Sequence, residues 1–314
     1  MYFTVMPTCL NVLTNSCDCC TFFTANFIKK TTMIAFIGMG HLGSNFVKAM
    51  LKKGEQVQVW NKTTAKATAL EAFGAKAFDQ VTDAVRGANR IHLTLKDDDT
   101  VNEILEKAST AFEPGVIIID HTTTSAAGAA ERTEGWKKRG YTYLHAPVFM
   151  GPQNALESTG TMLVSGDQEL IAQLQPELAK MTGKVMNFGT ENNKAAGMKL
   201  IGNLLLIAMT AGVADALSLG KAQHISPDDI ATLLESWNPG GMIPMRLKKI
   251  TSNTFDQPTW ELNMARKDAR LMIEGAREGG SRLMAIPAIA SEMDRWIEKG
   301  HGHDDWTVIA KDAV

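Results

Sequence analysis

The fold is decided by residues 33–43, which read MIAFIGMGHLG. Residues 34–37 are an apolar run typical of a short buried strand, and Gly38, Gly40 and Gly43 follow it directly. Residues 44–51 then repeat apolar side chains at helical spacing, and residues 56–60 (QVQVW) are typical of a second strand. Glycines spaced G-x-G-x-x-G between a strand and a helix predict a dinucleotide-binding turn.

Each glycine has its own task in such a turn. Gly38 permits the tight turn, Gly40 lets the backbone approach a pyrophosphate, and Gly43 lets the helix pack close to the strand. The free N–H groups at the helix N-terminus then bind the anion. The other residues expected to contact the cofactor are those between the glycines and one at the end of a later strand, namely Met39, His41, Leu42 and Leu95.

The end of the strand at residues 56–60 indicates which dinucleotide is preferred. An NAD site usually places Asp or Glu there, where the carboxylate accepts bonds from the ribose hydroxyls. This sequence has Asn61, Lys62 and Thr63 instead. A carboxylate would repel a 2′-phosphate, whereas an amide, a cation and a hydroxyl can bind one. We therefore expect NADP(H) in preference to NAD(H). The alternative is that Lys62 is a solvated lysine in a turn.

The remaining pattern divides the chain into two domains. Strands are expected at residues 90–95, 115–120, 141–148 and 161–166, with a helix at 99–108. This alternation predicts an α/β fold, a doubly wound (Rossmann) and mostly parallel sheet. From about residue 192 the apolar spacing is helical, with helices expected at 195–222, 227–237, 261–278 and 286–299. The expected domains are a dinucleotide-binding domain at 33–193 and an all-helical substrate and oligomerisation domain at 194–314.

Composition excludes several classes of function. The 314 residues carry 32 Lys+Arg against 34 Asp+Glu, a formal net charge of -2. No excess of cations is present to displace counterions from nucleic acid. A hydrophobic fraction of 45% is too high for a disordered chain. No run of about 18 uncharged apolar residues appears, so no transmembrane helix is expected. We expect a soluble globular protein with neither nucleic-acid nor membrane partners.

The first 32 residues do not fit this pattern. They hold all four cysteines, Cys9, Cys17, Cys19 and Cys20, without the second, distant ligand pair that a structural zinc site needs. They also lack the features of a secretory signal, and Met33 is a natural start. We expect these residues to be an extension with no catalytic role and no metal site. We also expect the protein to be cytoplasmic. Residues 301–305 (HGHDD) are similarly expected to form a solvated turn and helix cap rather than a metal site.

Two residues of the long predicted helix could carry out acid–base chemistry. Lys199 and Asn203 are four residues apart and therefore share one helix face. A lysine whose pKa is lowered by burial can exchange a proton with an alcohol oxygen during hydride transfer, and Asn203 could hold the lysine or the substrate hydroxyl. Leucines at positions 200, 204, 205 and 206 suggest that this helix is largely buried. The alternative is a lysine that snorkels from an amphipathic helix to solvent.

A substrate carboxylate would find polar groups after the strand at residues 115–120. Thr122 and Thr123 follow the carboxyl end of that strand, where open α/β sheets bind ligands. Their hydroxyls and backbone amides suit a carboxylate, and Thr122 is also expected to contact the cofactor. The alternative is that they cap the next helix. Gly151 would let the backbone approach the same carboxylate.

Four blocks in this order resemble the β-hydroxyacid dehydrogenase family, which includes 3-hydroxyisobutyrate dehydrogenase and semialdehyde reductases. They are the glycine turn, residues 120–125 (DHTTTS), residues 146–151 (APVFMG) continuing to 160–162 (GTM), and residues 197–203 (GMKLIGN). The resemblance covers nearly the whole chain after Met33. Residues 266–268 (RKD) are similar to the family's lysine–aspartate pair, found where the helical domain faces the cofactor.

The resemblance implies an oxidoreductase acting on a small β-hydroxy acid or semialdehyde, and residues 61–63 make NADP(H) the expected cofactor. It implies that Lys199 is the general acid/base and that Lys267 contacts the substrate carboxylate or the cofactor. It also implies a helical domain like that of 6-phosphogluconate dehydrogenase and a homodimer or homotetramer. Several residues depart from the family pattern and should alter the pocket: Thr122, His145, Phe149, Met150 and Pro152.

Two other functions remain as alternatives. Imine reductases share the fold and the cofactor turn but generally lack the lysine of the fourth block, so Lys199 counts against that function and the altered 149–150 segment counts mildly for it. A non-catalytic NADP-binding module is the second alternative. The pairing of Lys199 with Asn203 argues against it.

Overall fold

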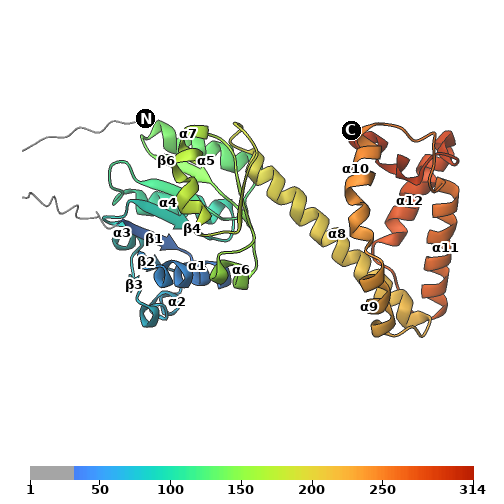
Figure 1. The fold of residues 1–314 in the computed structure, drawn as a ribbon, viewed down its shortest axis with the longest axis horizontal. Helices are drawn as coiled ribbons and strands as arrows, with labels where there is room; N and C mark the ends of the chain where they lie inside the picture. Colours follow the sequence, from blue (N-terminus) through green and yellow to red (C-terminus); the bar gives the residue numbers. More distant parts are fainter. Residues whose placement is uncertain (1–31) are drawn as a thin grey trace, which may run out of the picture.

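The computed structural model describes residues 32–314. Its first part is built on a six-stranded parallel sheet of order β3-β2-β1-β4-β5-β6 (Figure 1). The strands are β1 (Met33–Ile37), β2 (Gln56–Trp60), β3 (Lys76–Ala77), β4 (Arg90–Leu93), β5 (Ile117–Asp120) and β6 (Thr142–His145). The chain order reverses between β1 and β4. The predicted doubly wound sheet is confirmed.

Helices cover both faces of this sheet. They are α1 (His41–Lys52), α2 (Thr64–Thr68), α3 (Val81–Val85), α4 (Asp98–Ser109), α5 (Ala126–Lys138), α6 (Pro152–Glu157) and α7 (Gln168–Ala179), with a short 3-10 turn at Glu71–Phe73. One buried cluster includes Phe36 of β1 and Phe46 of α1, and another includes Leu93 of β4 and Leu105 of α4. Because both faces are covered, β1 reads as a continuous apolar run rather than an alternating one.

The later strands form a separate three-stranded sheet, which differs from the prediction. It contains β7 (Val148–Phe149), β8 (Thr161–Val164) and β9 (Lys184–Asn187), with β7 antiparallel and β9 parallel to β8. The single strand expected at residues 141–148 is therefore two strands, β6 and β7. Pro147 lies between them and has no N–H to donate to a ladder, so the chain leaves the main sheet there.

The second part is helical, as predicted. Its helices are α8 (Lys194–Ala222), α9 (Pro227–Ser236), α10 (Ile243–Thr251), α11 (Leu262–Glu278) and α12 (Ile286–Trp296), with shorter turns at Pro239–Met242, Ile297–His301 and Trp306–Ala313. Leu262, Ala269 and Trp296 belong to its buried cluster. The helix expected to reach residue 299 ends at Trp296, because Gly300 adopts a left-handed φ of 91° and the last turn is looser.

A single long helix, α8, runs from one part to the other (Figure 1). Its 29 residues span about 43 Å. The prediction that its leucines are buried is wrong within one chain, where Leu204 and Leu206 are 64% and 55% exposed and Leu200 and Leu205 are 43% and 42% exposed. Apolar side chains alone cannot tell a helix buried by its own chain from one that leaves an apolar face open.

By length and composition, α8 is also able to cross a membrane, with a mean hydropathy of 1.8 in its most apolar window. This differs from the expectation based on uncharged runs. One such helix is weak evidence for a span, because long apolar helices of soluble proteins have the same composition.

Near the end of α8, Asp215 accepts hydrogen bonds from the backbone N–H groups of Ala285 and Ile286, at 2.9 and 3.0 Å.

Candidate active site

The glycine turn lies directly against the end of β4. Gly38 has a φ of 97°, and a Cβ atom there would lie 2.2 Å from the carbonyl oxygen of Thr94. A Cβ atom on Gly43 would lie 2.0 Å from the carbonyl oxygen of Gly38. A Cβ atom on Gly40, by contrast, would have no described atom within 4 Å. The backbone is thus packed on one side and open on the other.

This open side fits a dinucleotide pyrophosphate. Gly40 is the N-cap residue of α1 and contributes no side chain to the helix end, so the first N–H groups of α1 are available to an anion. His41 is exposed and Leu42 is half-buried, while Met39 is buried beneath the turn. Of the residues expected to contact the cofactor here, Gly40, His41 and Leu42 are accessible.

The carboxyl ends of three strands are tied together beside this turn. The Thr94 hydroxyl donates to the carbonyl oxygen of Gly38 at 2.8 Å, and the Leu95 N–H donates to Thr122 Oγ1 at 2.9 Å. The turn, Leu95 and the loop after β5 therefore meet at the point where the strand order reverses. This is the position at which open α/β sheets bind their ligands.

Asn61 holds the turn rather than facing outward. Its Oδ1 accepts from the backbone N–H of Met39 at 2.9 Å, and its Nδ2 donates to the carbonyl oxygen of Thr63 at 3.0 Å. Lys62 and Thr63 remain exposed beside it. The side chains free to meet a 2′-phosphate are thus Lys62 and Thr63, whereas Asn61 orients them.

A second lysine beside this position was missed by the sequence reasoning. Lys66 of α2 lines an open cavity of about 380 Å³ together with Gly40 and His41. Its sequence signal was its position in the short helix that follows Thr63, three residues after that threonine. Lys48 of α1 lines the same cavity, so two lysines lie along this open space beside the dinucleotide turn.

The two threonines after β5 have different environments. Thr122 is 2% exposed. Its N–H donates to Asp120 Oδ1 at 2.9 Å, and its hydroxyl oxygen accepts the Leu95 bond. Thr123 is exposed. The helix cap is neither of them but Ser125, whose Oγ accepts from the N–H of Gly128 at 3.0 Å. A substrate carboxylate would therefore meet Thr123, with Thr122 joining the two loops beneath it.

Lys199 lies on the side of α8 that faces the smaller sheet. Its Nζ is 4.2 Å from the centre of the Phe149 ring, at the end of β7. Burial lowers the pKa of Lys199 below its usual range. Gly202 allows this contact, since a Cβ atom there would lie 2.2 Å from Cζ of Phe149. Lys199, Gly202 and Asn203 are half-buried together. The structural partner that the sequence did not reveal is Phe149.

The remaining predicted substrate residues, Gly151 and Lys267, lie far apart. Gly151 is the N-cap of α6, and its N–H donates to Asn154 Oδ1 at 2.9 Å. Lys267 belongs to α11 and pairs with Asp268 at 2.8 Å. Figure 1 shows α11 beyond the far end of α8 from the six-stranded sheet. Within one chain, the structure does not bring Lys267 to the glycine turn.

Three histidines, His92, His121 and His145, are buried under the site, and only His145 was expected to affect it. His121 Nδ1 donates to the carbonyl oxygen of Ala146 at 2.7 Å, so its Nε2 accepts from Nδ1 of His92, 3.0 Å away. Burial lowers the pKa of His121 to about 4 and the pKa of His92 well below its usual value. Both rings are therefore neutral at pH 7 and do not supply charge to the site. The third ring, that of His145, lies 3.8 Å from Oδ2 of Asp120.

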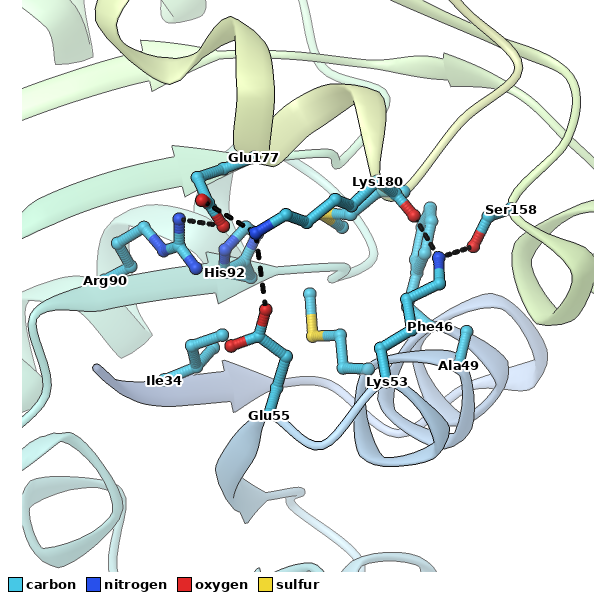
Figure 2. A pocket seen from close by; sticks show the side chains of 12 residues that line it. Ile34, Phe46, Ala49, Lys53, Glu55, Arg90, His92, Ser158, Glu177 and Lys180 are labelled. Carbon is cyan, nitrogen blue, oxygen red and sulfur yellow. Dashed lines mark hydrogen bonds and ion pairs between the residues drawn. The ribbon is translucent and has the colours of Figure 1, made fainter. Parts of the chain in front are cut away.

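A second cavity lies at the amino-terminal end of the strands, opposite the glycine turn, beside Arg90 at the start of β4 (Figure 2). Its charged side chains bind one another: Glu177 contacts Arg90 at 3.0 Å and Lys180 at 2.9 Å, and Lys53 donates to Ser158 Oγ at 2.5 Å. Its volume of about 20 Å³ holds roughly one water molecule. It is too small for a nucleotide or a substrate.

Within residues 32–314, no three His, Cys, Asp or Glu side chains come close enough to hold a metal ion. In the segment at residues 301–305, His301 contacts Asp304 at 2.6 Å, and Asp305 accepts from Lys249 at 2.6 Å. Asp305 also caps the last 3-10 helix through the N–H of Thr307. The four cysteines lie outside the described residues.

Comparisons with known proteins also indicate an NAD(P)-binding oxidoreductase. A family model described as "NAD binding domain of 6-phosphogluconate dehydrogenase" matches residues 33–189. The chain is 28% identical to glyoxylate/succinic semialdehyde reductase 2 of Arabidopsis thaliana, over 88% of this chain and 77% of that protein. It is 25% identical to the NAD-dependent L-serine dehydrogenase of Pseudomonas aeruginosa, over 88% and 96% of the two chains.

The fold is also similar to that of solved imine reductases. The imine reductase from Myxococcus stipitatus, solved in complex with NADP+, superposes with a TM-score of 0.83 at 22% identity. The match covers 90% of this chain and all of the other. At this identity the likeness concerns the fold. The chain is thus similar in sequence to a dehydrogenase and a semialdehyde reductase, and similar in fold to an imine reductase.

Proposed function

Because this chain belongs to the β-hydroxyacid dehydrogenase family, an NAD(P)-binding oxidoreductase family, we propose that it transfers a hydride between NADP(H) and a small β-hydroxy acid or the corresponding semialdehyde. The observation that carries this proposal is the half-buried Lys199, held against Phe149 on the α8 face turned toward the nucleotide-binding domain. A lysine with a lowered pKa is suited to proton exchange near neutral pH.

The chain's own residues supply binding and proton transfer. The bound nicotinamide supplies or accepts the hydride. The α1 N-terminus at Gly40 binds the pyrophosphate, and Thr123 binds the substrate carboxylate. In reduction, the Lys199 ammonium donates a proton to the oxygen of the carbonyl as its carbon receives the hydride, and in oxidation the amine takes that proton back. Asn203, one turn further along α8, holds the same oxygen.

The preference for NADP(H) rests on Lys62. Reversing its charge with Lys62→Glu should weaken NADPH binding by about 10- to 100-fold, the usual worth of a charge-assisted bond to phosphate. NADH binding should change by less than about 3-fold, because NADH has no 2′-phosphate for Lys62 to meet. Fluorescence titration of the reduced cofactors measures both dissociation constants.

The matched control is Lys138→Glu, which makes the same charge change on an exposed lysine in the last turn of α5. A helix that follows a parallel strand runs back toward the amino-terminal ends of the strands, so the last turn of α5 lies away from the cofactor site. This control should therefore leave the affinities for NADPH and NADH unchanged. Equal losses of NADPH and NADH affinity in Lys62→Glu would show that Lys62 does not read the phosphate.

Imine reduction is the second candidate function, favoured by the bulky Phe149 beside Lys199. A spectrophotometric screen separates the two. It pairs NADPH and NADH with glyoxylate, succinic semialdehyde, tartronate semialdehyde and a cyclic imine, and NADP+ and NAD+ with 3-hydroxyisobutyrate. Turnover of an acid or semialdehyde supports the proposal. Turnover of the imine alone would replace it with an imine reductase, and tight NADPH binding without turnover would indicate a non-catalytic module.

We further propose that the protein is a homodimer or homotetramer and that it is cytoplasmic. Ile207 and Leu204 of α8 are 72% and 64% exposed, and Met264 of α11 is 47% exposed. Exposed apolar side chains concentrated along one helix, as on α8, are typical of an interface between subunits. A second chain packed along α8 could bring its own α11 and Lys267 to the site. Residues 21–314 hold no cysteine, which suits a reducing compartment.

Sedimentation velocity measures the assembly directly. We expect a dimer or tetramer for the unmodified chain, and a shift toward monomer when Leu204 and Ile207 are both replaced by glutamate. Lys138→Glu serves again as the control for added surface charge. A monomer at micromolar concentration would contradict the assembly without affecting the proposed chemistry.

A further inference from the structure

A buried chain of hydrogen bonds supports the loop on which Thr123 lies. At its centre is Arg132 of α5, a residue only 6% exposed. Its Nε donates to the hydroxyl oxygen of Tyr143 at 3.0 Å, and its two terminal nitrogens donate to Asp98 Oδ1 at 2.7 Å and Thr124 Oγ1 at 2.8 Å. A buried arginine is costly unless all of its charge is matched, so this arrangement calls for a reason.

The chain continues from Tyr143 to the end of β5. The Tyr143 hydroxyl donates to Asp120 Oδ2 at 2.7 Å, and Asp120 Oδ1 accepts from the N–H of Thr122. Burial alone would raise the pKa of Asp120, but His145, 3.8 Å away, and the bonds from Thr122 and Tyr143 lower it to about 2. Asp120 is therefore a buried carboxylate at neutral pH, and its negative charge lies close to the expected position of a substrate carboxylate.

These bonds hold the loop on both sides of Thr123. Thr122 is fixed by Asp120, Thr124 by Arg132, and the N–H of Ser125 donates to Asp98 Oδ2 at 2.9 Å. Thr123 is the exposed residue between them. Asp98 also begins α4, directly after the loop that carries Leu95. One guanidinium thus connects the two loops that border the dinucleotide site.

We infer that Arg132, acting through Tyr143 and Asp120, is a positioning residue that sets Thr123 for binding a substrate carboxylate and offsets the charge of Asp120 there. This inference rests on the proposed function, because it names a residue that serves the substrate of that reaction. A carboxylate-bearing substrate needs the chain intact. An uncharged aldehyde of similar size does not.

Tyr143→Phe breaks the chain with the loss of one oxygen atom. We expect KM for the best semialdehyde acid to rise by about 10- to 30-fold with kcat within about 3-fold, because a carboxylate contact made equally in ground and transition states affects KM alone. For the matching aldehyde without a carboxylate, and for NADPH binding, we expect changes below about 2-fold. Tyr141→Phe is the control, since Tyr141 packs by its ring against Phe112 and Trp136.

A double-mutant cycle with Thr123→Val tests whether the effect passes through Thr123. If it does, Tyr143→Phe adds less than about 2-fold to the KM of Thr123→Val. Multiplied effects, or an equal loss for the uncharged aldehyde, would overturn the inference. Arg132→Lys repeats the test if Tyr143→Phe does not fold, because one ammonium cannot make the three-way bond of a guanidinium.

Hydrogen–deuterium exchange separates this inference from the proposed function. The backbone amides of residues 122–125 should exchange at least about 10-fold faster in Tyr143→Phe than in the unmodified protein, whatever the substrate is. Absence of turnover with every acid would overturn the proposed function and with it the carboxylate role. Unchanged exchange would overturn the positioning role even where turnover is observed.

Discussion

Replacing Lys199 with alanine should lower kcat for reduction of the best semialdehyde by about 10²- to 10⁴-fold, the range measured for loss of a general acid. The reason is that Lys199 is the cation whose burial against Phe149 lowers its pKa, so it can release a proton where an exposed lysine would not. NADPH affinity should stay within about 3-fold, since the glycine turn and Lys62 are untouched. Stopped-flow single turnovers separate the chemical step from product release.

The control for this variant is Lys194→Ala, which removes an exposed lysine from the first position of the same helix. It should retain at least half of the activity. Equal activity in the two variants would exclude Lys199 as the proton donor and would favour a reductase that draws its proton from another group.

The proposed role of Lys199 also predicts how the activity depends on pH. In the proposed reduction the Lys199 ammonium is the proton donor, so kcat should fall as pH rises through the lowered pKa of Lys199. Arginine stays protonated throughout the accessible range, so any residual activity of Lys199→Arg should not show this alkaline fall.

Gly43→Ala should have the largest effect on stability. Its Cβ atom would lie 2.0 Å from the carbonyl oxygen of Gly38 in the turn and 2.4 Å from Oγ1 of Thr94, which follows β4. The helix α1 would have to move away from β1, and overpacking of this kind costs about 3 kcal/mol of unfolding free energy. We expect NADPH binding to be lost as well. Urea unfolding of the cofactor-free protein and NADPH titration measure the two effects.

The matched variant is Gly40→Ala, where no atom of the described chain lies within 4 Å of the added methyl group. Its unfolding free energy should change by less than about 0.5 kcal/mol, as at other unconstrained surface positions. NADPH binding should nevertheless weaken at least about 10-fold, because the methyl group occupies the space through which the pyrophosphate approaches. Similar losses of stability in both variants would contradict the distinct tasks of the two glycines.

Much of this architecture was predictable because it depends on local patterns. The turn at Gly38 and Gly43 and the helices of the second domain follow from glycine spacing and apolar periodicity, which are local in sequence. The separate sheet of β7, β8 and β9 was not predicted, because strand pairing is set by contacts distant in sequence and only Pro147 marks the break.

The sequence predicted which kinds of side chain form the candidate site better than it predicted what those side chains contact. Asn61 and Thr122 were expected to face ligands, and both instead use their polar groups on neighbouring loops. Arg132 and Tyr143 gave no local signal, since their importance comes from a bond between α5 and β6. Phe149 could be recognised only as a departure from the family pattern, and its contact with Lys199 required the fold.

The long, nearly bare α8 bears on how cooperatively the molecule melts. Within residues 32–314, the buried clusters of the sheet domain and of the helical domain have no residue in common, and α8 is their main connection. An isolated chain should therefore lose its two domains in separate thermal transitions, and no single melting temperature describes it. A subunit packed along α8 would couple those transitions and raise them with protein concentration. Cooperativity would then belong to the assembly and not to the chain.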